Sequence, residues 1–247
     1  IDAFCCNDRS GSVKKAEPSA AKGADLSGKD ADFVRNILDG CGFVKYDSKT
    51  GEYCFHNLIS EYLRKEFDKL SDELKEKYYL KAADSELACG EKLSAFELYY
   101  KAGAYEKIFS MPHTSYDLCD IENPQTHKMI FDILDKTPRA VKVKYPESMV
   151  PLAFILFFLN EQQKLFETVG EIFEVVGESK LSQHEKNRIL GETELLVSFS
   201  EFNDIAKMSA HHKRAYQLLG TKASLINMKS TWSFGSPSVM CLYHSHS

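Results

Sequence analysis

The thiol of Cys54 and the imidazole of His56 lie two residues apart, close enough in the chain to suggest a nucleophile and its base. Cysteine hydrolase chemistry needs both groups in contact and a third group that orients the imidazole. The two side chains share a face only if one strand runs through both positions, and no third partner can be named. We therefore expect the chain not to be an enzyme.

Metal chemistry has weak support. His211 and His212 are neighbours in a helical pattern, and adjacent helical side chains diverge by about 100°, so they cannot bind one ion together. His212 falls on an apolar stripe and is expected in the core. The seven cysteines include no CxxC pair, so reduced thiols in a cytoplasmic protein are the simplest interpretation.

Three aromatic residues, Trp232, Phe234 and Tyr243, occupy a C-terminal segment over residues 221–247 that is rich in Ser and Thr. They form a low-specificity candidate for binding an effector or partner, because aromatic rings stack on sugars and flat metabolites. The alternative is that this aromatic tail is a plug that closes the end of a helical stack. The sequence leaves both interpretations open.

The composition is that of a soluble globular protein, with 43% hydrophobic and 27% charged residues among 247. A net charge of -5 disfavours a chain-wide nucleic-acid surface. The most apolar run, residues 149–159, is shorter than the ~20 residues of a membrane span and is expected to form a buried helix. The chain starts at Ile1 without a signal-peptide pattern, so we expect an internal piece of a larger cytoplasmic protein.

The first seventy residues predict a winged-helix-like module. A flexible linker is expected over residues 10–29, followed by a short helix that Asp30 caps and that ends at a left-handed Gly40. Residues 43–55 have the alternation and turn chemistry of a β-hairpin. An amphipathic helix follows, with its apolar stripe on Leu58, Ile59, Tyr62, Leu63, Phe67 and Leu70.

Residues 71–220 predict a helical-repeat domain of short antiparallel helices joined by glycine turns. Ser71 and Asn123 are expected N-caps, and Gly90, Gly103 and Gly220 are expected helix ends. The last helix is expected to carry one apolar stripe, formed by Phe202, Ile205, Met208, His212, Tyr216 and Leu219. The predicted fold class is therefore mainly α, a winged-helix module with a β-hairpin followed by a tetratricopeptide-like helical-hairpin solenoid.

Several segments resemble the MalT-like regulators, the ATP-dependent branch of the LuxR family of transcription factors. Residues 53–64 (YCFHNLISEYLR) are similar to the family's winged helix, where an aromatic strand runs into His-x-Leu and a helix ending in Leu-Arg. Residues 102–106 (AGAYE) resemble its first helical repeat. Stretches at 202–205 and 232–238 (WSFGSPS) are similar to the far end of its repeat region.

The resemblance implies the middle of a signal-transducing regulator. An ATPase domain would precede this segment and a helix-turn-helix DNA-binding domain would follow it, and these are its expected partners, with a small-molecule inducer or regulatory protein. The chain has no GxxxxGK[ST] loop, so ATP or ADP is expected only in the upstream domain. His56 matches the histidine that approaches the β-phosphate of ADP in such proteins. The alternative is a histidine that only satisfies backbone groups at a helix start.

The predicted function is therefore a regulatory and effector- or partner-sensing segment of an ATP-dependent transcription regulator, without catalysis of its own. The alternative is a stand-alone tetratricopeptide-like protein-interaction adaptor. Direct DNA binding is not expected, because residues 25–70 carry nine acidic and seven basic side chains. No membrane contact and no cofactor in this segment are expected.

Overall fold

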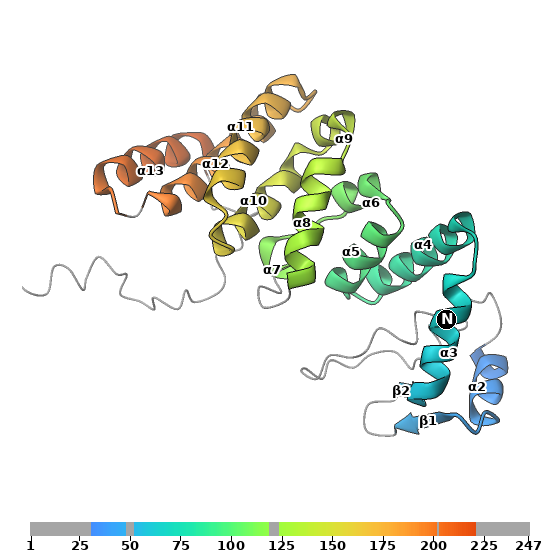
Figure 1. Cartoon of the computed structure of the whole chain (residues 1–247). Coiled ribbons are helices and arrows are strands. Elements are labelled where there is room, and N and C mark those ends of the chain that lie inside the picture. Colours follow the sequence, from blue (N-terminus) through green and yellow to red (C-terminus); the bar gives the residue numbers. More distant parts are fainter. Residues whose placement is uncertain (1–30, 48–51, 119–123, 202, 221–247) are drawn as a thin grey trace, which may run out of the picture. The chain divides into compact units, whose positions relative to one another are not determined.

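The computed structural model describes residues 31–47, 52–118, 124–201 and 203–220. These residues are mainly helical, as predicted, with one two-stranded sheet (Figure 1). The predicted linker at 10–29 lies outside the described residues, as does the predicted aromatic tail. The chain divides into two compact units, of which the first ends at Ile108 and the second begins at Phe109. The predicted boundaries after residues 70 and 220 stay predictions.

The first unit starts with the predicted order of helix, hairpin and helix. Helix α2 is followed by the antiparallel strands β1 and β2, which place Val44 opposite Phe55. Leu38 of α2 is buried against Val34, Val44 and Phe55, which makes a small core between the helix and the hairpin. The bounds are α2 Ala31–Asp39, β1 Val44–Asp47, β2 Glu52–Phe55 and α3 Asn57–Asp68.

Helix α2 does not end as predicted. Gly40 is not among the residues with positive φ, and its N–H donates to the carbonyl of Asn36 at 3.1 Å in the helical pattern. The N–H of Cys41 then donates to the carbonyl of Leu38 at 3.1 Å, which tightens the last turn before the hairpin. The left-handed terminator expected at Gly40 is therefore absent.

Helices α4 (Asp72–Ala88) and α5 (Lys92–Lys101) pack against each other as a helical hairpin (Figure 1). The Ser71 hydroxyl caps α4 as predicted by accepting a hydrogen bond from the Leu74 N–H. The buried Tyr99 of α5 donates its hydroxyl to Asp84 Oδ1 at 2.5 Å, and burial together with this carboxylate raises the pKa of Tyr99. This polar contact joins the two helices beside the buried side chains of α5.

Three helices end in the same hydrogen-bonded turn. After α4, the N–H of Glu91 donates to the carbonyl of Glu86 and the N–H of Gly90 to that of Leu87, which is a Schellman motif. The same pair of bonds recurs after α5, around the left-handed Gly103, and after helix α10, around the left-handed Asn160. The next helix starts two residues later each time, at Lys92, Tyr105 and Gln162.

The second unit is organised around α10. Residues Met149 to Leu156 of this helix are all buried, which confirms the predicted buried helix, and Pro151 is tolerated in its first turn. Helix α10 packs against α7, α8, α11 and α12. The bounds are α6 Tyr105–Ser110, α7 Ser115–Leu118, α8 Pro124–Lys136, α9 Arg139–Lys144, η2 Pro146–Ser148, α10 Met149–Phe158, α11 Gln162–Glu178, α12 Gln183–Ser200 and α13 Ile205–Leu219.

Helices α12 and α13 make the closest helix pair of the second unit. Ser182 and Glu185 form a capping box at the start of α12, and this hydrogen bonding lowers the pKa of Glu185. Near the middle of α12, a Cβ added to Gly191 would meet Leu219 Cγ at 2.7 Å and Leu218 Cβ at 3.1 Å. Gly191 is therefore what permits the close approach of α13.

The buried face of α13 differs from the predicted one. His212, expected in the core, is exposed, and so are Ile205 and Tyr216 of the predicted stripe. The buried residue is Ala215, and His211 lies on the inner side with its Nδ1 2.6 Å from Glu194 Oε2. Arg214 Nε donates to the same carboxylate oxygen at 2.9 Å. The ionic contacts with Glu194 orient α13, because they must stay paired where they are partly buried.

Candidate partner-binding surfaces

His56 occupies the N-cap of α3, immediately after β2 ends at Phe55. Its Nδ1 accepts a 3.4 Å hydrogen bond from the Leu58 N–H, which is the local backbone role considered for it. A neutral imidazole that accepts at Nδ1 carries its proton on Nε2. Because the side chain is exposed, Nε2 can donate to a group of another domain while the cap persists. Nucleotide sensing by His56 stays a prediction.

Substitution of His56 separates the cap from the imidazole. We expect His56→Ala to lower the free energy of unfolding of the first unit by about 0.5–1 kcal/mol, because the Leu58 N–H loses its acceptor. His56→Asn should restore that stability, because asparagine is a good N-cap without an imidazole. Urea denaturation of the purified chain measures both. Equal stability of the wild type and His56→Ala would contradict a capping role.

The other polar candidates are not assembled into a site. Cys54 and His56 do not share a continuous strand, because the strand stops between them. Within the described ranges, no three His, Cys, Asp or Glu side chains are placed to hold a metal ion together. Trp232, Phe234 and Tyr243 lie beyond residue 220, outside the part of the chain that the structure describes. Their binding role is untested.

Exposed apolar side chains are the most conspicuous surface feature of the first unit. Each of three helices presents to solvent two large apolar residues four positions apart, which places them on one face. Of the six residues predicted as the apolar stripe of α3, only Phe67 is buried, and Leu58 is 70% exposed. These exposed apolar pairs are Phe33 and Ile37 on α2, Leu58 and Tyr62 on α3, and Leu74 and Tyr78 on α4.

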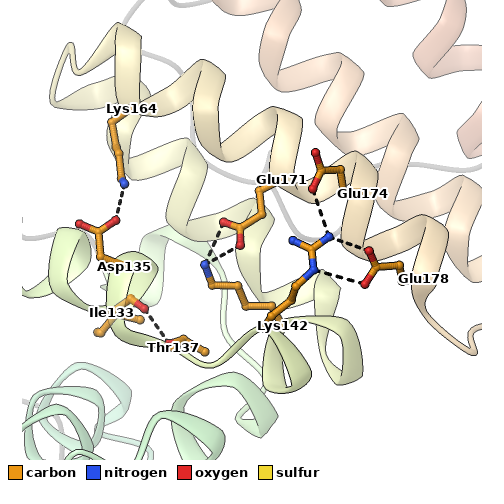
Figure 2. A network of polar contacts seen from close by, with 9 residues as sticks. Ile133, Asp135, Thr137, Lys142, Lys164, Glu171, Glu174 and Glu178 are labelled. Carbon is orange, nitrogen blue, oxygen red and sulfur yellow. Dashed lines mark hydrogen bonds and ion pairs between the residues drawn. The ribbon is translucent and has the colours of Figure 1, made fainter.

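In the second unit, a polar network holds helices α8 and α9 against α11 (Figure 2). The ammonium group of Lys142, whose residue is only 5% exposed, donates to both carboxylate oxygens of Glu171 at 2.7 and 2.8 Å. The Arg139 guanidinium donates to Glu174 at 3.1 Å and to Glu178 at 2.6 Å, which lowers the pKa of Glu178. Lys164 pairs with Asp135. One side of α11 is thus fixed by ionic contacts.

The solvent side of α11 carries two phenylalanines and two glycines in one row. Phe166 and Phe173 are 45% and 41% exposed. Gly170 and Gly177 lie between and beyond them, at positions where an added Cβ would meet no atom within 4 Å. We call Phe166, Gly170, Phe173 and Gly177 the α11 outer face. The spacing of hydrophobic residues does not predict the α11 outer face, because the buried Leu165, Val169 and Ile172 dominate the helical pattern.

The chain matches no protein-family model, and no curated protein or solved structure is similar to it. The surfaces themselves therefore carry the functional argument. Among the described residues, no helix combines the length and the apolar character that crossing a membrane requires.

The exposed apolar pairs were not singled out by sequence reasoning, which placed Leu58 and Tyr62 on the apolar stripe of an amphipathic helix. A usable signal exists in the sequence. The stripe of α3 places two aromatic or aliphatic residues per turn over three turns, which is more apolar surface than a two-stranded hairpin can cover. An excess of apolar positions over available partners indicates a surface meant for another molecule.

Proposed function

We propose that this chain is a regulatory, partner-sensing segment of a larger ATP-dependent transcription regulator, and that it acts through protein contacts without catalysis of its own. The observation that carries the proposal is the set of exposed apolar pairs on α2, α3 and α4. Large apolar side chains exposed on three helices cost solubility unless another surface covers them. In the proposed regulator, the neighbouring ATPase domain covers the exposed apolar pairs. The likeness of residues 53–64 to the MalT-like pattern supports this assignment.

The proposal assigns winged-helix character to residues 31–68 and a tetratricopeptide-like solenoid to the helices that follow. Support comes from the order helix, hairpin, helix in the first segment and from the helical hairpins α4–α5, α10–α11 and α12–α13. In this scheme His56 contributes one imidazole hydrogen bond to the phosphate of bound ADP. A charge-assisted hydrogen bond is worth about 1.5–3 kcal/mol, enough to shift a resting equilibrium roughly ten- to a hundredfold.

The test uses the complete regulator with a reporter gene under its control. Leu58→Lys/Tyr62→Lys places two charges on the exposed face of α3 without disturbing buried side chains, so we expect a tenfold or larger change in transcription without inducer. The matched control is Ile205→Lys/Tyr216→Lys, which alters an equally exposed pair on α13. We expect the control to leave transcription unchanged. Both variants should keep the melting temperature of the wild-type chain.

The alternative function is a stand-alone tetratricopeptide-like adaptor, which would bind a partner with no effect on transcription. Unchanged reporter output from Leu58→Lys/Tyr62→Lys, in a protein that remains folded, would reject the regulator and leave the adaptor. A similar response from both lysine pairs would show that added charge, and not the face of α3, causes the change.

A further inference from the structure

The α11 outer face has a regular shape. Its four residues are spaced by four, three and four positions, so they form one line along the helix. Two half-exposed rings alternate with two glycines that have open space above them. Gly170 and Gly177 are seven residues, or about 10 Å, apart. A second helix also presents side chains every seven residues on one face. Two of its large side chains could therefore occupy the open spaces above Gly170 and Gly177 at the same time.

Among the described residues, no side chain fills the space where a Cβ of Gly170 or Gly177 would lie, and Lys186 Nζ reaches only the Gly177 carbonyl, at 3.1 Å. Glycine inside a helix is less stable than alanine, and an alanine methyl would meet no neighbour at either position. Gly191 is different, since Leu218 and Leu219 fill the space where its Cβ would be. A contact with another molecule gives Gly170 and Gly177 the close-approach role that Gly191 has inside the fold.

Charge beside the row favours a basic partner. Glu167, Glu171, Glu174 and Glu178 follow the same spacing one position further along α11. Lys142 neutralises Glu171, and Arg139 bridges Glu174 and Glu178. Within the part of the chain that the structure describes, the polar partner of the exposed Glu167 is the neutral amide of Gln163, which donates to it at 2.9 Å. The N-terminal half of the row therefore offers a carboxylate to a cation from outside.

A second copy of this chain fits the shape but not the charge. A two-fold axis between antiparallel α11 helices would place Phe166 over Gly177 and Phe173 over Gly170. The same axis would bring Glu167 of one copy, which has no cation beside it, to the same side as the glutamates of the other copy, where a cation would be more favourable. Charge therefore favours a basic helix of another protein over a second copy of this chain, whereas shape alone fits both.

We propose that the α11 outer face docks an amphipathic helix of another protein that carries large aliphatic side chains seven residues apart with Lys or Arg beside them. This inference rests on the proposed function as a partner-sensing segment. The helix lays one aliphatic side chain over Gly170, between the rings of Phe166 and Phe173, and another over Gly177, beyond Phe173, and it pairs a cation with Glu167. The contact is small, so the expected dissociation constant lies at roughly 10–100 μM.

The probe is a fluorescently labelled 18-residue helical peptide with Leu at the core heptad positions, Lys beside them and Ala elsewhere. A second peptide replaces every Lys with Glu. Fluorescence anisotropy with the full chain should show at least tenfold tighter binding of the Lys peptide. Gly170→Ala/Gly177→Ala should weaken binding of the Lys peptide at least tenfold, because two methyl groups fill the gaps. The same variant should raise the melting temperature by roughly 3–6 °C, because helix propensity improves.

Charge reversal gives an independent readout. Glu167→Lys should reverse the preference of the chain between the Lys and Glu peptides. The matched control Asp72→Lys makes the same change of net charge on a fully exposed position of the first unit, and it should leave the preference as it was. Equal responses to the two charge reversals would mean that net charge alone attracts the peptide and would overturn the proposal.

Undiminished binding by Gly170→Ala/Gly177→Ala would also overturn it. Self-association in analytical ultracentrifugation that the two alanines abolish would assign the face to a second copy instead. The peptide assay does not depend on the reporter assay: Leu58→Lys/Tyr62→Lys lies in the first unit and should bind the Lys peptide like the wild type. Failure of the docking proposal therefore leaves the regulatory proposal standing, and the reverse also holds.

Discussion

Removal of the Glu171 carboxylate is expected to lower the free energy of unfolding of the second unit by about 2–4 kcal/mol. Glu171→Ala leaves the Lys142 ammonium without either of its acceptors in a place where water reaches it poorly. An uncompensated buried charge costs several times more than a surface ion pair contributes. Urea denaturation followed by circular dichroism measures the change.

The double variant Lys142→Met/Glu171→Leu is the control. It removes both charges and keeps the side-chain volumes similar, so its stability should lie close to that of the wild type or above it. The expected result is strong non-additivity, in which the second substitution rescues the first. If Glu171→Ala costs less than about 1 kcal/mol, Lys142 is better solvated than its 5% exposure indicates.

Gly191→Val is expected to destabilise the α12–α13 pair by about 3 kcal/mol. The new Cβ would lie 2.7 Å from Leu219 Cγ and 3.1 Å from Leu218 Cβ, so α13 must move away or adopt strained rotamers. Thermal unfolding should show a lower melting temperature and reduced helix content at residues 205–219. Hydrogen exchange resolves which helix loosens.

A compensating variant tests the cause of that loss. Gly191→Val/Leu219→Ala deletes the side chain that the valine would meet, so it should recover a large part of the stability if the clash is responsible. A double variant that is less stable than either single one would point instead to a general loss of packing. The close approach at Gly191 would then not be the cause.

Helix ends can be predicted from the sequence where local chemistry alone decides them. Ser71 accepts a hydrogen bond from the first turn of α4 as expected, and no tertiary contact is needed for that. Gly90 and Gly103 adopt positive φ in Schellman turns for the same reason. Asn160 makes an identical turn, yet asparagine is a weaker signal than glycine and the sequence analysis did not identify it.

The faces of helices were predicted less well, because burial depends on which partner is present. In α13 the apolar residues Ile205 and Tyr216 face solvent, while His211 lies partly buried with its Nδ1 against Glu194 of α12. The side chains of Leu218 and Leu219 lie over Gly191, and Ala215 is the buried residue of α13. Nothing in the spacing of α13 itself contains that information.

The candidate surfaces could not be predicted for the same reason, because exposure also depends on which partner is present. A stripe of apolar residues in α3 predicts a buried face, and only the structure shows that a hairpin this small leaves Leu58 and Tyr62 uncovered. His56 was selected by resemblance, and the structure adds that its Nδ1 caps α3 while its exposed ring keeps Nε2 available. The α11 outer face could not be predicted from the sequence, because the sequence does not show that the space above Gly170 and Gly177 is open.

The recurring Schellman turn has a consequence for how the chain acquires its structure during synthesis. Because such turns leave only three residues between helices, packed helices such as α4 and α5 are also neighbours in the sequence. Native contacts of this kind close short loops, which lowers the entropic barrier and favours rapid folding. Each hairpin can bury its apolar side as soon as its second helix leaves the ribosome, before distant segments exist. We therefore expect little dependence on chaperones, even with the exposed apolar pairs of the first unit.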